Sequence, residues 1–278
     1  MIYQFLSTLP YHSISFHCYN SLVSDLTDSI TFLGTAGARF VVIHQFLASG
    51  GAWLRLGDAQ ILLDPGPGCL VQAAKRKLDP AKLDAIILSH RHLDHSGDIN
   101  VMIEAMTNGG TVRRGTVFAP ADALDEDPVI LSYLRSYPQS IQVLSEGGSY
   151  TLNDVSFRTP VRHKHQVETY GLVFQTPRHT FSWITDTRYF DGLASNYEGD
   201  LLVINVVRLK PGAPLDHLSL PEAKSIIEEL RPKATILTHF GMTMWRARPW
   251  ELAERLTQET GVTVVAARDG MKFDLAHS

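Results

Sequence analysis

The chain has 278 residues, of which 44% are hydrophobic and 19% charged, a composition that suits a folded globular protein and excludes extensive disorder. Its formal net charge of −4 and isoelectric point near 6.3 disfavour general binding to nucleic acid. No apolar run approaches the roughly 20 residues that span a bilayer, and two cysteines cannot form a disulfide framework. We therefore expect a cytoplasmic protein that does not bind a membrane.

The amino-terminal segment differs from the rest of the chain. Residues 1–28 lack the alternating helix and strand patterns that begin at residue 29, so we interpret them as an N-terminal extension to a single domain at 29–278. The first twenty residues contain no Lys or Arg, and polar residues interrupt their apolar run. These features are atypical of a signal peptide.

From residue 29 onward, short β-rich runs alternate with helical patterns, which is typical of an α/β protein. Four strands are predicted first, at 29–34, 39–46, 53–57 and 59–64. Helix patterns follow at 68–77 and 98–106, strand patterns at 84–89 and 115–120, and no clear pattern at 121–139. The run at 84–89 is apolar without alternation, which indicates a strand buried on both faces.

The second half of the chain repeats this arrangement. Strand patterns occur at 155–160, 169–174, 180–185, 200–207, 234–239 and 262–267, and helix patterns at 219–230 and 248–260. Ser219 and Glu222 form a capping box, which marks the start of a helix, and Asp269-Gly270 is typical of a tight turn. The two halves predict an αββα sandwich, in which two mixed sheets lie face to face with helices outside.

The residues that bear chemistry gather directly after the apolar strand at 84–89. Three imidazoles and a carboxylate, His90, His92, Asp94 and His95, occupy six residues. Such donors suit a borderline cation such as Zn²⁺, and irregular backbone at a strand end can direct alternate side chains into one cavity. Four donors in one loop exceed what a single ion usually takes, so we expect two metal ions. A solvated polar loop rarely has this spacing, because four buried polar groups need a compensating partner.

This histidine motif resembles the metallo-β-lactamase superfamily, and later motifs follow in that superfamily's order over residues 29–273. The glycine-rich segment at 32–38 and the H-x-V-x-x-Y-G pattern that begins at His165 are similar to the ribonuclease Z-like, phosphodiesterase-like branch. The resemblance implies the αββα fold and gives Asp64 the role of orienting the histidine loop. It also makes His165 the third-motif ligand, with His163 as the second choice.

The same resemblance supplies the remaining ligands. Asp186 follows a predicted strand and is similar to the carboxylate that bridges two metals, and His239 ends another strand and matches the last ligand. The implied sets are His90, His92 and His165 for one ion, Asp94, His95 and His239 for the other, and Asp186 for both. Zn²⁺ is the expected metal, and Mn²⁺ or Fe²⁺ suits the same donors.

These residues predict a dinuclear metal-dependent hydrolase. As a hypothesis, the two ions lower the pKa of a bridging water, so that hydroxide is available near neutral pH. Asp94 would orient this hydroxide with its free oxygen. His217 matches a histidine that the branch uses near the leaving group, and it would donate the proton that the leaving oxygen needs. A helix-entry histidine bonded to the backbone is the alternative interpretation of His217.

The spacing of the later motifs narrows the substrate. Ribonuclease Z enzymes that process tRNA carry an arm between the third-motif histidine and the later motifs. Here 20 residues lie between His165 and Asp186, and 30 lie between Asp186 and His217. A tRNA-binding arm has no room, and neither has the inserted domain of the β-CASP nucleases. A small anionic phosphodiester or cyclic phosphate is therefore favoured over nucleic acid.

Two other functions stay open at this point. Thioester and lactone hydrolases of the glyoxalase II and lactonase kinds share the first cluster, but typically have a Gly-His-Thr element where this chain has Lys164-His165-Gln166. A non-catalytic metal-binding protein or a di-iron redox protein is the third alternative, although the redox relatives carry a Glu in the first cluster and a flavin domain. Related proteins are often homodimers, so a homodimer is one expected assembly.

Overall fold

The computed structural model describes residues 28–125, 127–212 and 215–277. Most of the predicted N-terminal extension lies outside these ranges, so the extension stays a prediction. Its last residue, Asp28, is 1% exposed and belongs to the folded body. None of the helices in the described ranges has the length and apolar character needed to cross a membrane.

The first sheet has seven strands, in the order β14-β1-β2-β3-β4-β5-β6. They are β1 (Ser29–Phe32), β2 (Ala52–Leu56), β3 (Ala59–Leu63), β4 (Ala85–Ile87), β5 (Thr116–Ala119), β6 (Ser140–Val143) and β14 (Lys272–Asp274). Neighbours from β14 to β3 pair antiparallel, whereas those from β3 to β6 pair parallel. The sheet is therefore mixed, with its parallel strands at one edge.

The second sheet repeats this plan in the order β13-β12-β11-β10-β9-β8-β7. Its strands are β7 (Gly148–Leu152), β8 (Val155–Thr159), β9 (Leu172–Gln175), β10 (Thr180–Ile184), β11 (Leu201–Asn205), β12 (Ala234–Thr238) and β13 (Thr263–Ala266). Strands β7 to β10 pair antiparallel and β10 to β13 pair parallel. The predicted likeness of the two halves of the chain is confirmed.

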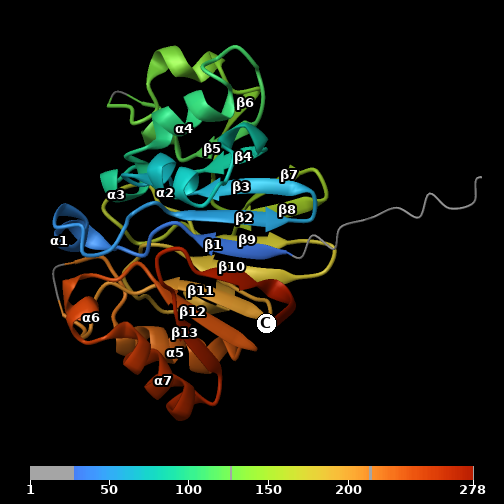
Figure 1. Cartoon of the computed structure of the whole chain (residues 1–278). Coiled ribbons are helices and arrows are strands. Elements are labelled where there is room, and N and C mark those ends of the chain that lie inside the picture. Colours follow the sequence, from blue (N-terminus) through green and yellow to red (C-terminus); the bar gives the residue numbers. More distant parts are fainter. Residues whose placement is uncertain (1–27, 126, 213–214, 278) are drawn as a thin grey trace, which may run out of the picture.

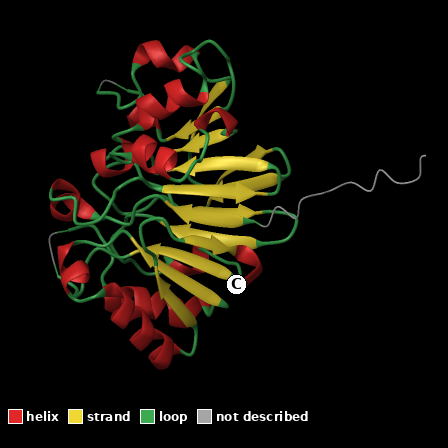
Figure 2. Cartoon of the chain, in the orientation of Figure 1, coloured by secondary structure: helices red, strands yellow, loops and turns green. Residues whose placement is uncertain are grey.

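Helices cover the outer faces of the two sheets (Figure 1, Figure 2). On the first sheet, α2 (Cys69–Lys75) and α4 (Ile99–Met106) pack over a core that includes Leu62 and Ile86. On the second, α5 (Leu220–Leu230) and α7 (Pro249–Thr260) pack over Leu202 and Ile204. A third apolar core fills the space between the sheets. The predicted αββα sandwich is therefore confirmed, and so is the capping box of Ser219 and Glu222 at the start of α5.

Shorter helices complete the chain. Three of them, α1 (Ala38–Ile43), α3 (Leu93–Ser96) and α6 (Met242–Arg246), lie on the same side of the molecule (Figure 1). Single 3₁₀ turns occur at Pro80–Lys82, Ala121–Ala123, Ser132–Ser136, Ala194–Asn196 and Leu275–His277. Two of these turns account for the segment at 121–139 that showed no clear pattern.

The strand predicted at 39–46 is wrong, because this segment forms helix α1. Its β-branched and aromatic run suggested a strand, but the backbone has already left the sheet. Ala36 pairs with Phe240 in an isolated bridge, and the Gly37 N–H donates to the Phe240 carbonyl at 3.0 Å. This tertiary pairing outweighs local β-propensity, which depends strongly on context. In the helix, Val41 is fully buried whereas Phe40 is 61% exposed.

The strands direct two sets of connections to opposite ends of the sandwich. The loops after β4, β10, β11 and β12, together with the β8–β9 loop, form one end, which we call the loop rim. The β2–β3 and β9–β10 turns lie at the other end, the hairpin rim, because they precede β3 and β10. Ligand sites of parallel α/β sheets gather beyond the carboxyl ends of the strands, so the loop rim is the expected place for a functional site.

Candidate metal centre

All seven residues predicted to bind metal lie at the loop rim. The segment from His90 to His95 follows β4 and includes α3. Asp186 follows β10, and His239 follows β12. His165 lies in the β8–β9 loop, and the predicted proton donor His217 lies between β11 and α5. Residues from five separate loops thus meet at one place.

The carboxylate of Asp186 is the centre of the arrangement. Its Oδ2 atom lies 3.3 Å from the Nε2 atoms of both His95 and His239. The same oxygen lies 3.8 Å from His90 Nε2 and 3.4 Å from His217 Nδ1. Four imidazoles therefore face one carboxylate that is 2% exposed.

The donor atoms separate into groups that could each hold a metal ion. One group is His90, His92 and His165, and another is Asp94, His95 and His239, with the donor atoms of each group within 4.8 Å of one another. These are the two sets that the family resemblance implied. Two further groups, His90, His95 and Asp186, and His165, Asp186 and His217, satisfy the same distance. Asp186 thus lies between the two sets, where a bridging ligand has to be.

Hydrogen bonds at the Nδ1 atom orient two imidazoles of the His90–His95 segment, those of His90 and His95. His95 Nδ1 donates to Asp64 Oδ2 at 2.9 Å, because a carboxylate only accepts. Ser89 Oγ donates to the same oxygen at 2.7 Å and lies 3.0 Å from His90 Nδ1. Asp64 Oδ1 also accepts from the Ser89 backbone N–H at 2.7 Å. Asp64 therefore orients the histidine loop, leaving Nε2 of both imidazoles to face Asp186.

The third imidazole of the first set is held in the same way. His165 Nδ1 donates to the carbonyl of Asp216 at 2.9 Å, and His165 Nε2 lies 3.1 Å from His92 Nδ1. His163, the second choice for this ligand, faces elsewhere. Its Nδ1 donates to the backbone carbonyl of Asp186 at 3.1 Å, and its Nε2 lies 2.5 Å from the hydroxyl of Tyr197. Both nitrogens of His163 are engaged, so it positions the Asp186 backbone and offers no donor to a metal.

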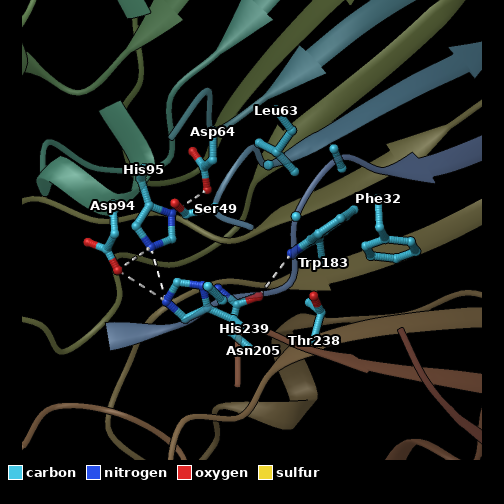
Figure 3. Close-up of a pocket in the computed structure, with 14 residues that line it drawn as sticks. Phe32, Ser49, Leu63, Asp64, Asp94, His95, Trp183, Asn205, Thr238 and His239 are labelled. Atoms are coloured by element: carbon cyan, nitrogen blue, oxygen red, sulfur yellow. Dashed lines mark hydrogen bonds and ion pairs between the residues drawn. The ribbon is translucent and has the colours of Figure 1, made fainter. Parts of the chain in front are cut away.

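Two hydrogen bonds in series also hold the Asp186 side chain, and the first of them, between Trp183 and Asn205, is drawn in Figure 3. Trp183 Nε1 donates to Asn205 Oδ1 at 3.3 Å, and Asn205 Nδ2 donates to Asp186 Oδ1 at 2.9 Å. This amide leaves Oδ2 directed at the imidazoles. A cavity of about 30 Å³ beside Asp94, His95 and His239 is lined by Trp183 and Asn205 as well, and it is large enough for a water molecule.

The backbone approaches the centre closely at two glycines. A Cβ atom on Gly37 would overlap the carbonyl of His239, and one on Gly66 would overlap the carbonyls of Ser49 and Asp94. His239 itself adopts a left-handed conformation with φ of 60°, which is uncommon for a residue with a side chain. Such backbone strain is found most often at functional sites, and here it turns the last imidazole toward Asp186.

Burial and charge move the pKa values of these groups in opposite directions. Burial lowers the pKa of His90 well below its ordinary value. Burial also disfavours protonated His95, but the carboxylates of Asp64, Asp186 and Asp94 raise its pKa well above the ordinary value. Burial would raise the pKa of Asp186, but His239, His217 and His95 hold it well below its usual range. The centre therefore favours an ionised carboxylate among imidazoles.

The donor set fits a divalent metal ion. His90 Nε2 and His217 Nδ1 are buried atoms with no hydrogen-bond partner among the described residues, and each such atom costs free energy unless something binds it. Imidazole nitrogens and carboxylate oxygens are donors that Zn²⁺, Mn²⁺ and Fe²⁺ accept. The residues present therefore suit the metals that the sequence predicted.

The sequence predicted Asp64 as a residue that orients the ligands, but the other residues with this role were missed. Asn205 and the carbonyl of Asp216 hydrogen-bond ligand side chains directly, whereas Tyr197 bonds His163, which positions the Asp186 backbone. Only Asn205 left a signal in the sequence, as a polar residue inside the otherwise apolar run at 201–207. A buried polar group in such a strand needs a partner, and here the partner is Asp186.

Comparison with known proteins identifies the family. The family model for a beta-lactamase superfamily domain matches residues 59–240, the part of the chain that carries every predicted ligand. The chain belongs to the metallo-β-lactamase superfamily. It has the superfamily's metallo-hydrolase fold, as the histidine motif indicated.

Relatives place the chain near the ribonuclease Z-like branch. An uncharacterized protein of Methanocaldococcus jannaschii, MJ1374, is 30% identical over 255 residues, covering 88% of this chain and 94% of its own. The probable metallo-hydrolase YhfI of Bacillus subtilis is 26% identical, covering 76% and 86%. A ribonuclease Z of Methanococcus maripaludis is 25% identical, covering 78% and 77%.

Solved structures agree with this fold. The crystal structure of YhfI from Bacillus subtilis superposes with a TM-score of 0.75 at 20% identity and covers 89% of this chain and 99% of its own. A diphosphatase from the PhnP family superposes with a TM-score of 0.66 at 21% identity, covering 89% and 98%. At these identities the likeness extends to the fold alone.

Proposed function

We propose that this protein is a dinuclear metal-dependent hydrolase that cleaves a small phosphodiester or cyclic phosphate. The observation that carries the proposal is the meeting of two three-residue donor groups at the buried carboxylate of Asp186. His90, His92 and His165 would hold one ion, Asp94, His95 and His239 the other, and Asp186 both. When bound, such ions activate a water molecule and polarise the bond that is broken.

Asp94 is the residue best placed to direct the attacking water. Its Oδ2 lies 3.6 Å from His239 Nε2 and 3.8 Å from His95 Nε2, inside the second donor group. Its other carboxylate oxygen can then accept a hydrogen bond from the water and orient it. Asp94 is more exposed than His95 or His239, which suits a group that must meet both metal and solvent.

His217 faces the same oxygen of Asp186, beside His165, and would serve the leaving group. Burial lowers the pKa of His217 to about 4, although the Asp186 carboxylate opposes this shift. The imidazole is therefore neutral in the free protein at neutral pH. A bound phosphodiester brings negative charge beside Nδ1 and favours the protonated form. His217 would then hold a proton at Nδ1 and pass it to the departing oxygen. Arg208 Nε donates to the His217 carbonyl at 3.0 Å and fixes the loop.

The length of the loops supports a small substrate. Between His165 and His217 the described residues form β9, β10, one 3₁₀ turn, β11 and their short connections. The 20 residues between His165 and Asp186 and the 30 between Asp186 and His217 leave no room for a domain-sized insertion, which supports a site without a tRNA-binding arm. The relatives include a ribonuclease Z, and a diphosphatase shares the fold. Both names describe phosphate chemistry, which favours a phosphoester over a thioester or lactone.

A substrate panel tests the proposal. The purified protein, supplied with Zn²⁺ or Mn²⁺, would be assayed with bis(p-nitrophenyl) phosphate, a nucleoside 2′,3′-cyclic phosphate, a thioester and a lactone. We expect kcat/KM for the better phosphodiester to exceed that for either acyl substrate by at least about 100-fold. Turnover of the acyl substrates alone would contradict the substrate class, and no turnover of any substrate by fully metallated protein would favour a non-catalytic metal-binding protein.

The role of His217 has a separate test in the same panel. p-Nitrophenolate is a good leaving group that needs little protonation, whereas the alkoxide leaving a cyclic phosphate needs a proton. His217→Ala should therefore lower kcat for the cyclic phosphate by about 10²-fold or more and for bis(p-nitrophenyl) phosphate much less. Equal losses on the two substrates would mean that His217 is a metal ligand or a structural residue.

A further inference from the structure

A second cavity lies next to the loop that carries His239, because Phe240, the residue after His239, is part of its lining. Its volume is about 450 Å³, and residues that line it include Leu47, Phe240, Trp245, Trp250, Arg268 and Asp269. None of the seven predicted metal ligands is among its lining residues. Sites for small organic ligands typically have volumes of about 300–1,000 Å³, so this cavity has the size of a ligand site distinct from the metal centre.

Two tryptophans give the cavity aromatic walls. Trp245, on α6, and Trp250, on α7, have ring centroids 6.1 Å apart and planes inclined by 73°. Trp250 is 42% exposed, and the apolar face of α7 that packs on the sheet is formed by other residues, including Leu252 and Leu256. An indole left open to solvent at a cavity is a typical contact for an aromatic ligand, because large aromatic surfaces gain most from burial.

The charged residues of the cavity favour an anion. The carboxylate of Asp269 is already engaged, since it accepts hydrogen bonds from Thr35 N–H at 2.9 Å, Thr35 Oγ1 at 2.8 Å and Ala48 N–H at 2.8 Å. The neighbouring Arg268 is exposed. Its guanidinium makes no ion pair or hydrogen bond with any residue in the described ranges. A cation without a partner beside apolar walls is complementary to an acidic group attached to an aromatic ring.

We propose that this cavity binds a small aromatic carboxylate, with the ring against the indole of Trp250 and the carboxylate on Arg268. One residue of the cavity lining, Phe240, is adjacent in the chain to a predicted metal ligand. Phe240 lines the cavity, directly follows His239 and donates its N–H to the Thr35 carbonyl at 2.8 Å. The proposal does not depend on the substrate of the metal centre, because it rests on different residues.

Isothermal titration calorimetry of the full-length protein with 1-naphthoate tests the site. The neutral analogue 1-naphthalenemethanol has the same ring system without the charge. We expect 1-naphthoate to bind with one-to-one stoichiometry, and the neutral analogue to bind at least about 10-fold more weakly. Equal affinity for the two compounds, or no binding of either, would overturn the proposal.

Three variants locate the binding. Arg268→Gln should weaken 1-naphthoate binding by about 10-fold and leave 1-naphthalenemethanol unchanged, whereas Trp250→Ala should weaken both. Arg255→Gln, an exposed arginine of α7 outside the cavity, is the matched control and should change neither. Thermal unfolding of each variant shows whether it folds. If folded Arg268→Gln and Trp250→Ala proteins bind 1-naphthoate as tightly as the wild type, the ligand lies elsewhere, for instance at the metal centre, and the proposal fails.

Discussion

The two rims of the sandwich each bury a carboxylate, but they surround it differently. At the hairpin rim, Asp28 Oδ1 accepts from the Gly57 N–H and from Arg178 Nη2, both at 2.8 Å, and Oδ2 accepts from Thr176 Oγ1 at 2.9 Å. Gly57 belongs to the β2–β3 turn and Thr176 to the β9–β10 turn, so Asp28 joins the two sheets. Both carboxylate oxygens of Asp28 thus have hydrogen-bond partners from the chain itself.

At the loop rim, the groups around Asp186 do not all have hydrogen-bond partners among the described residues. Asn205 donates to Oδ1, but four imidazoles face Oδ2 at 3.3–3.8 Å. Two of their buried nitrogens have no hydrogen-bond partner among the described residues. A buried carboxylate with complete hydrogen bonds therefore serves stability, whereas a buried carboxylate beside imidazole nitrogens that have no partner indicates a ligand site.

The largest expected effect follows from removing the charge of Asp186. Asp186→Asn keeps the shape of the side chain but removes the carboxylate shared by both donor groups. We expect the protein to bind fewer than two metal ions and kcat for bis(p-nitrophenyl) phosphate to fall by about 10³-fold. Elemental analysis and steady-state kinetics measure the two quantities. Two bound ions together with kcat within tenfold of the wild type would show that Asp186 does not bridge the centre.

A smaller loss is expected when the support of Asp186 is removed. Asn205→Ala deletes the donor to Asp186 Oδ1, and partners of this kind typically contribute 10- to 100-fold, so we expect metal affinity to fall by about that factor. Competition with a chromogenic chelator measures the affinity. Asn196→Ala, which removes an amide bonded to the Gly192 carbonyl on the surface, is the control. Equal metal affinities for the two variants would show that Asn205 does not support the metal centre.

At the hairpin rim the same kind of change should affect stability and spare activity. Asp28→Asn weakens charge-assisted hydrogen bonds to both sheets, and we expect it to lower the free energy of unfolding by about 2 kcal/mol. Urea denaturation at neutral pH measures this, with Asp58→Asn in the exposed β2–β3 turn as control. If kcat fell with Asp28→Asn while stability did not, the division between the two rims would be wrong.

The smallest expected effect is a pH dependence of that stability difference. Burial would raise the pKa of Asp28, but hydrogen bonds from Gly57, Arg178 and Thr176 hold it below its ordinary value. A carboxyl with a lowered folded-state pKa contributes stability above its unfolded pKa of about 4 and loses it as pH falls. The gap between wild type and Asp28→Asn should therefore narrow below about pH 4. A gap that widens on acidification would contradict this sign.

Much of the fold could be predicted because local patterns and global structure agree. The unbroken apolar runs of β4 and β11 indicate strands buried on both faces, and α5 has both a capping box and one apolar face. The edge strands β6, β7 and β14 were missed, because they are short and partly polar and depend on pairing with a neighbour. The segment of α1 was predicted as a strand, since its β-branched residues favour one wherever tertiary contacts do not intervene.

Spacing alone predicted one part of the site, whereas the other part depended on the order of the motifs. His90, His92, Asp94 and His95 are adjacent in the sequence, so their spacing alone indicates a shared metal site. His165, Asp186 and His239 are far apart, and only the order of motifs joined them before the structure brought them together. Tyr197 was out of reach, because a hydrogen bond between distant residues leaves no periodic pattern. Asn205 left one signal, a polar residue in an apolar run, but that signal does not name its partner.

We propose that Asp186 joins two metal sites into one catalytic centre. The most direct measurement is a titration of metal-free protein with Zn²⁺ or Mn²⁺, in which hydrolysis of bis(p-nitrophenyl) phosphate is followed against the molar ratio of metal to protein. We predict that activity rises until two ions are bound per chain and then stays constant. Full activity at one ion per chain, or activity that does not depend on metal, would show that catalysis does not need two metal ions joined by Asp186.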